Sequence, residues 1–147
     1  MMGLDMYAYS VDSTYKKEVD EFNSYPSNER QTLIDLNHRF TGDLEEIASW
    51  RKHNALHNWM EDLYREKGFT DDFNCTMMEL TREDILRLKD SIDNNNLTCT
   101  SGFFFGDTNY MENGEYEEFY KDSDLSFIEE ALDELDDGRF IYYESWW

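Results

Sequence analysis

Residues 3–10 read Gly-Leu-Asp-Met-Tyr-Ala-Tyr-Ser, and their side chains alternate between the two faces of an extended chain. Leu4, Met6 and Ala8 share one apolar face, whereas the opposite face is polar and aromatic. This two-residue period predicts a β-strand with one buried side. The Gly-Phe-Phe-Phe-Gly segment at 102–106 is apolar on both faces, which is typical of a central strand covered on both sides. We expect two further strands, at 73–80 and at 139–147.

Residues 43–67 predict one long amphipathic helix. Asp43 is its candidate N-cap, and Gly68 is a natural stop. At 100° per residue, one arc of this helix is apolar and faces a core. The arc consists of Ala48, Ala55, Leu56, Trp59, Met60 and Leu63.

Further helices are predicted on both sides of this segment. Thr81 and Asp84 have the spacing of a capping box, and the apolar residues that follow have helical spacing. Another helix begins at Ser123 or Asp124 and ends at Gly138. Residues 13–23 fit a helix or a loop, and Ser27 could cap a short helix after Pro26. Three or four helices with about four strands predict a single α+β domain, 1–147, with a small, mostly antiparallel sheet.

The composition favours a folded chain with a strong negative charge. The 147 residues include 13 Lys+Arg and 34 Asp+Glu, a formal net charge of −21, while aromatic residues make up 16%. The aromatic content can build a core despite the charge. Nucleic acids and anionic membranes bind basic patches, so we expect neither as a direct partner. The sequence shows no secretory signal and no apolar run long enough for a membrane span, so we expect a cytoplasmic protein.

The negative charge is concentrated between Asp107 and Asp137, where 13 acidic residues accompany one base, Lys121. This stretch could be a solvated face, a sign of a halophilic proteome, or a surface that imitates the phosphate backbone of DNA. On the third interpretation it binds a host protein with a basic surface. The acids of the predicted partner-binding surface are Glu112, Glu115, Glu117, Glu118, Asp122, Glu129, Glu130, Asp133, Glu134, Asp136 and Asp137.

The polar side of the predicted 43–67 helix is the second candidate site. It offers a planar guanidinium, amides that donate and accept hydrogen bonds, and a stacking surface. It could bind an anion or a polar small molecule such as a nucleotide, or it could be covered by a second layer of the fold. The residues are Trp50, Arg51, Asn54, His57 and Asn58.

The sequence contains no recognisable catalytic motif. It has no G-x-S-x-G, P-loop or dinucleotide fingerprint, so we assign no catalytic residue. His53, His57 and Glu61 repeat every four residues, but Glu61 lies too far along a helix to complete a compact zinc site. Cys75 and Cys99 are expected to stay reduced. We therefore predict no metal and no cofactor.

Several short motifs are similar to those of a family of small, uncharacterised tailed-phage proteins. They are the start Gly3 to Tyr7, the Trp-Arg-Lys motif at 50–52 with Asn54, His57 and Trp59, the Ser-Gly-Phe-Phe-Phe-Gly motif at 101–106, and the aromatic C-terminus that ends at Trp147. The resemblance implies expression in the cytoplasm of an infected bacterium and carries no named activity.

Together these observations suggest two functions of different classes. The first is a phage accessory protein that binds and inhibits a host protein, such as a defence or nucleic-acid-binding protein, through its acidic surface. The second is a small-molecule binder, or a modest enzyme, that uses the polar face of the 43–67 helix. A virion component is neither supported nor excluded. Trp146 and Trp147 either cover the core or are buried by a partner chain, which leaves a homodimer open.

Overall fold

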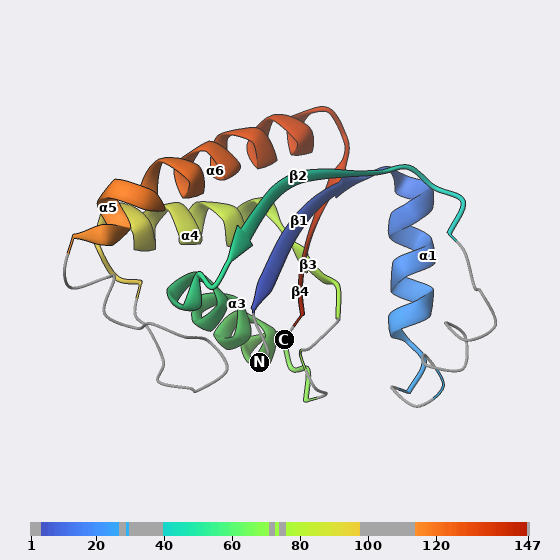
Figure 1. Cartoon of the computed structure of the whole chain (residues 1–147). Coiled ribbons are helices and arrows are strands. Elements are labelled where there is room, and N and C mark those ends of the chain that lie inside the picture. Colours follow the sequence, from blue (N-terminus) through green and yellow to red (C-terminus); the bar gives the residue numbers. More distant parts are fainter. Residues whose placement is uncertain are drawn as a thin grey trace.

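Four strands form one antiparallel sheet in the order β2-β1-β4-β3. The structure is a computed structural model that describes residues 4–26, 29, 40–70, 73, 76–97 and 114–146. The strands are β1 (Asp5–Val11), β2 (Leu44–Arg51), β3 (Met78–Leu80) and β4 (Phe140–Trp146). The helices in the described ranges are α1 (Ser13–Asn23), α3 (Asn54–Glu66), α4 (Arg82–Asp93), α5 (Glu115–Phe119) and α6 (Lys121–Asp136) (Figure 1).

This architecture confirms the predicted α+β class, with a sheet of four antiparallel strands and five helices among the described residues. The 3–10 strand lies at the centre of the sheet as β1, between β2 and β4. Its residues Leu4, Met6 and Ala8 are fully buried, as their alternation predicts. None of the described helices is long and apolar enough to cross a membrane.

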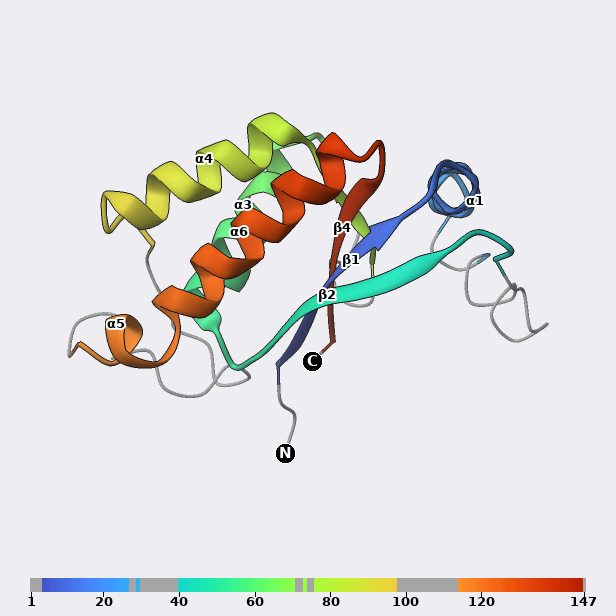
Figure 2. The same cartoon turned by 90° about the horizontal axis from the view of Figure 1, so that it is seen from above.

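The two faces of the sheet carry two separate cores. Ala8 of β1 lies opposite Tyr143 of β4, and both face the large core, to which α3, α4 and α6 contribute. Tyr9 lies opposite Tyr142, and both face a smaller core that includes Val19 of α1. The views in Figures 1 and 2 agree, with α3, α4 and α6 on one side of the sheet and α1 on the other.

The prediction of one helix over 43–67 is wrong in its first half. Residues 44–51 form β2, an edge strand of the sheet, and the helix begins only at Asn54. Met6 of β1 lies opposite Trp50, and Ala8 lies opposite Ala48, so these two residues follow the period of a strand. The chain then turns at Lys52, which has a φ of 56°. The β1–β2 register shifts between Ala8 and Tyr9, which pair with Ala48 and Glu46, so Ile47 is an extra residue on β2.

Asp43 therefore caps no helix. Its carboxylate accepts a hydrogen bond from Arg139 Nη2 at 2.8 Å, and its carbonyl accepts one from the Asp12 amide at 3.1 Å. The second half of the prediction is confirmed. The buried side of α3 includes Ala55, Leu56, Met60 and Leu63, and the chain leaves the helix through Gly68, whose φ is 94°.

The capping box at Thr81 is confirmed: its side chain accepts from the Asp84 amide, and the Asp84 side chain accepts from the Thr81 amide. Residues 13–23, which fitted a helix or a loop, form a helix. Asp12 is its N-cap, and the Asp12 carboxylate accepts a hydrogen bond from the Tyr15 amide at 2.8 Å. The final aromatic strand is confirmed as β4. The predicted strand at 73–80 is shorter, because only Met78–Leu80 pairs with β4.

Ser123 and Asp124 do not cap α6, which begins earlier, at Lys121. Asp124 instead lies within the helix and is buried. The predicted end is confirmed, since the helix stops at Asp136 and Gly138 follows with a φ of 83°. The expected strand at 102–106, the Ser27 helix cap and both cysteines lie outside the described residues.

Candidate functional site

The acidic surface is formed by the outward faces of α5 and α6. On α6 the opposite stripe packs into the large core through Phe127, Ile128 and Ala131, which forces the charged residues between them toward solvent. The exposed acids of this surface are Glu115, Glu117, Glu118, Asp122, Glu129, Glu130, Asp133, Asp136 and Asp137. The structure thus brings together most of the acids that the sequence analysis proposed, while Asp107 and Glu112 lie outside its described part.

Two of the proposed acids have partners on other elements. Glu134 is half-buried, accepts from Ser10 Oγ at 2.9 Å and lies 3.5 Å from Arg139 Nε. Asp136 pairs with Arg82 of α4. Within the described ranges, no ion pair reaches the remaining acids Glu117, Glu118, Asp122, Glu129, Glu130, Asp133 and Asp137.

Asp124 holds the acidic helices to the rest of the fold. Its Oδ1 accepts from Trp50 Nε1 at 2.9 Å. Its Oδ2 accepts from Tyr116 Oη at 2.9 Å and lies 2.7 Å from His53 Nε2. The side chains of Asp124 and His53 are 1% and 0% exposed. These four residues, which we call the Asp124 anchor, link β2, the start of α3, α5 and α6 through one buried carboxylate.

Aromatic packing encloses the Asp124 anchor. The His53 ring lies 4.7 Å from the Tyr120 ring, centroid to centroid, and Trp50 packs edge-on against Phe127 at 5.1 Å. Burial raises the pKa of the Tyr116 hydroxyl, and the Asp124 carboxylate raises it further. Tyr116 therefore stays protonated and remains a hydrogen-bond donor. The acidic helices are consequently fixed in orientation relative to the sheet.

The residues of the predicted small-molecule site lie on two different elements, because the chain changes from the strand β2 to the helix α3 between Arg51 and Asn54. Trp50 is buried in the Asp124 anchor, while Arg51 is exposed on β2 with its Nε 3.7 Å from Asp5 Oδ1. Asn54 and His57 are buried in α3, and Asn58 is half-buried. The five residues therefore do not form the single exposed helix face on which the prediction of a ligand site depended.

His57 is a core residue in this fold. Its Nδ1 lies 2.8 Å from Tyr143 Oη, and its ring stacks on Phe73 with centroids 5.4 Å apart. Burial lowers the pKa of His57 to about 4, so the imidazole is neutral at physiological pH. Among the described residues, no group of three or more His, Cys, Asp or Glu side chains is arranged to hold a metal ion.

The structural role of Asp124 was not predicted, because the helix was expected to begin at Ser123 or Asp124 and begins at Lys121. With the helix starting at Lys121, Asp124 shares one face with Phe127, Ile128 and Ala131, at spacings of three, four and seven residues. An aspartate within such an apolar stripe indicates a buried carboxylate that needs donors. That pattern was the available signal. Trp50 and His53 lie 74 and 71 residues away in the sequence, and Tyr116 lies eight residues away on α5, a spacing that no local rule marks as a contact.

Comparisons of the chain with protein-family models, with curated proteins and with solved structures found no significant match.

Proposed function

We propose that the protein is a non-enzymatic phage accessory protein that binds and inhibits a basic host protein in the cytoplasm of the infected bacterium. The contact surface is the acidic surface of α5 and α6. The observation that carries the proposal is that this surface combines carboxylates without ion-pair partners in the described residues with a rigid attachment, the Asp124 anchor.

The charge density along α6 supports a partner that normally binds nucleic acid. Glu129, Glu130 and Asp133, which no ion pair reaches in the described part of the chain, span four helical steps, or about 6 Å, because each residue advances about 1.5 Å. That is about one charge per 3 Å, compared with about one per 1.7 Å in duplex DNA. A basic groove that accepts phosphates would meet carboxylates at a comparable density.

Energetic considerations also favour a partner with positive charge. Like charges three or four residues apart on a helix each cost about 0.2–0.5 kcal/mol, so the exposed row on α6 is not a stabilising feature of the isolated chain. Cations from a partner would add attractive interactions that offset this repulsion. A net charge of −21 would also steer a basic protein toward the surface and raise its association rate.

The phage setting is supported by the resemblance of the motifs at 3–7, 50–57 and 101–106 to small tailed-phage proteins. An inhibitor that imitates DNA would act on defence nucleases or other nucleic-acid-binding proteins of the host. It would act without touching nucleic acid itself, because like charges repel.

The test is a pull-down from bacterial extract with the immobilised chain, followed by titration of each captured protein with purified chain. We expect basic, nucleic-acid-binding proteins whose affinity falls steeply between about 50 mM and 200 mM salt, and which duplex DNA displaces. The variant Glu129→Lys, Glu130→Lys, Asp133→Lys should lose this binding.

A matched control separates the surface from the overall charge. Glu45→Lys, Glu46→Lys, Asp62→Lys changes the net charge by the same amount at three exposed acids of β2 and α3. This control should keep its partners at nearly the parental affinity. Equal loss in both triple variants, or no loss in either, would contradict a role for the acidic surface.

A further inference from the structure

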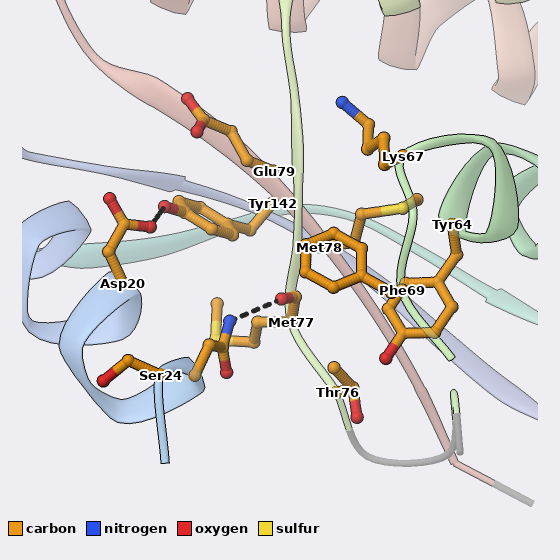
Figure 3. Close-up of a pocket in the computed structure, with 11 residues that line it drawn as sticks. Asp20, Ser24, Tyr64, Lys67, Phe69, Thr76, Met77, Met78, Glu79 and Tyr142 are labelled. Atoms are coloured by element: carbon orange, nitrogen blue, oxygen red, sulfur yellow. Dashed lines mark hydrogen bonds between the residues drawn. The ribbon is translucent and has the colours of Figure 1, made fainter. Parts of the chain in front are cut away.

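A cavity of about 430 Å³ is lined by residues of other elements than the acidic surface. It is formed where the C-terminal half of α1, the strand β3 with the residues before it, and the end of α3 come together (Figure 3). Its volume lies within the range of small-molecule sites. None of the residues that the sequence analysis singled out as site residues lines it.

One side of the cavity is aromatic and apolar. The rings of Tyr64 and Phe69 stack with centroids 4.9 Å apart and planes 17° apart, and Phe69 is 48% exposed. Met78 lies on the same side of β3 as these rings and is 2% exposed, whereas Met77 lies on the side of β3 that faces α1 (Figure 3). The exposed Phe69 ring offers a contact for an aliphatic chain and a π face for a cation, and the flexible Met77 thioether offers a second, adaptable apolar contact.

The other side carries an excess of negative charge. Lys16 Nζ donates to Asp20 Oδ2 at 2.9 Å and to Glu79 Oε1 at 2.9 Å. One positive charge therefore faces two negative charges. Asp20 Oδ1 also accepts from Tyr142 Oη at 3.0 Å. Burial raises the pKa of the Tyr142 hydroxyl, and the carboxylates of Glu79 and Asp20 raise it further. This corner of the cavity is therefore a place of negative potential.

Lys67, the cationic residue that lines the cavity, already forms an ion pair with Asp84. Lys67 Nζ donates to Asp84 Oδ2 at 2.7 Å, and the Asp84 side chain is 8% exposed. Because Asp84 also accepts the amide of Thr81 in the capping box of α4, removing Lys67 from it would leave a nearly buried carboxylate without its counterion. The site therefore has no cation to offer a phosphate or another anion.

We propose that this cavity binds an organic cation, an ammonium or guanidinium group on an aliphatic stem. The stem lies along Met77 and Phe69, and the charged head reaches the carboxylates of Glu79 and Asp20. Two sources share this chemistry, a free polyamine and a lysine or arginine side chain of a peptide. The site lies on different elements from the acidic surface and stands independently of the proposed function.

The test is an NMR titration of the whole chain with two probes, spermidine and a capped Gly-Arg-Gly peptide. We expect saturable shifts of the backbone amides of Phe69, Met77 and Glu79. Saturation by spermidine alone assigns the site to free polyamines, and saturation by the peptide alone assigns it to a side chain. In both cases 1-hexanol, which has a stem and no charge, should give no saturable shift.

Three variants make the test specific. Phe69→Ala should weaken binding about threefold to fivefold through loss of the ring face. Glu79→Gln should weaken it about tenfold through loss of a charged acceptor. Lys16→Met should tighten binding severalfold, because it removes the cation that competes for both carboxylates, and damage to the fold would not produce such a gain.

Glu130→Gln on α6 is the matched control for Glu79→Gln, because it makes the same charge change far from the cavity. Equal weakening in these two variants would show that probes bind only the overall negative charge and would overturn the proposal. Saturation by 1-hexanol, or an unchanged affinity in both Glu79→Gln and Lys16→Met, would overturn it as well.

Discussion

The two faces of α6 carry carboxylates in opposite circumstances. Asp124 is buried, and Trp50, Tyr116 and His53 surround its two oxygens. Glu130, less than two turns further along, is exposed and has no ion pair in the described part of the chain. The comparison teaches that an acidic residue on this helix is structural where donors from other elements converge on it. Where none do, it is available to a partner.

The largest effect should come from removing the buried carboxylate. Asp124→Ala leaves the donors of Trp50 and Tyr116 and the ring of His53 without their acceptor in a dry interior. We expect the free energy of unfolding to fall by about 3–5 kcal/mol. Urea titration followed by tryptophan fluorescence measures it.

Asp124→Asn keeps one acceptor oxygen and should cost less than Asp124→Ala. Glu130→Ala, on the exposed face, should change stability by no more than about 0.5 kcal/mol. Similar losses for Asp124→Ala and Glu130→Ala would remove the distinction between the two faces.

The next effect concerns His57, a buried ring whose Nδ1 lies 2.8 Å from Tyr143 Oη. Its pKa is about 4 in the folded chain, below the ordinary value near 6.5, because burial disfavours the charged ring. At pH 5 the unfolded chain therefore binds a proton that the folded chain does not. Stability falls as pH drops through this window, by about 2 kcal/mol between pH 7 and pH 5.

The measurement is the difference in unfolding free energy between the parent and His57→Gln at pH 7 and pH 5. The difference isolates the histidine from the exposed acids, whose mutual repulsion weakens as they take up protons. The variant should be less stable at pH 7 and should lose the histidine's share of the pH dependence. A parallel pH dependence in both proteins would show that His57 does not titrate as its burial requires.

Glu134 is an intermediate case, half-buried between Ser10 and Arg139. Glu134→Gln keeps an acceptor for Ser10 Oγ and loses the charge that faces Arg139. Because both charged side chains are about one-fifth exposed, we expect a loss of about 0.5–1 kcal/mol, measured by urea unfolding. The loss should shrink in high salt. A stabilising effect would place Glu134 with the exposed acids instead.

The smallest effect should have the opposite sign. Neutralising the exposed row with Glu129→Gln, Glu130→Gln, Asp133→Asn removes like-charge repulsion. We expect a gain of about 0.2–0.5 kcal/mol at low ionic strength, and less at high salt because screening already weakens the repulsion. Thermal unfolding at two salt concentrations measures it. Destabilisation would mean that these acids make stabilising contacts.

The elements with strong local signals were predictable from the sequence. The alternation at 3–10 predicted the buried side of β1, and Thr81 with Asp84 predicted the start of α4. The prediction for 43–67 failed because Ala48 fits the apolar arc of a helix, with Trp50 on the opposite side, as well as it fits a strand. Only pairing with β1 decides between them, and pairing is not a local property. The turn at Lys52 has a positive φ that its residue type does not announce.

The sites were predictable only in part. The acidic surface follows from composition, because exposed charge needs no specific neighbour. The Asp124 anchor and the cavity beside β3 depend on residues far apart in sequence. Trp50 meets Asp124, and Lys16 meets Glu79, through the packing of separate elements. No rule of sequence spacing predicts contacts between such distant residues, so these two sites could be identified only from the folded structure.

The strand order of the sheet has a consequence for how the chain folds during synthesis. The first and last strands, β1 and β4, are neighbours at the centre of the sheet, with Asp5 opposite Trp146. β1 cannot pair with β4 until residues 140–146 have been synthesised. Before then, the edge of β1 that pairs with β4 has no partner strand, while α3 and α4 can already form because their hydrogen bonds are local. A large share of such distant contacts slows folding and exposes the nascent chain to aggregation, which repulsion among its many carboxylates counteracts.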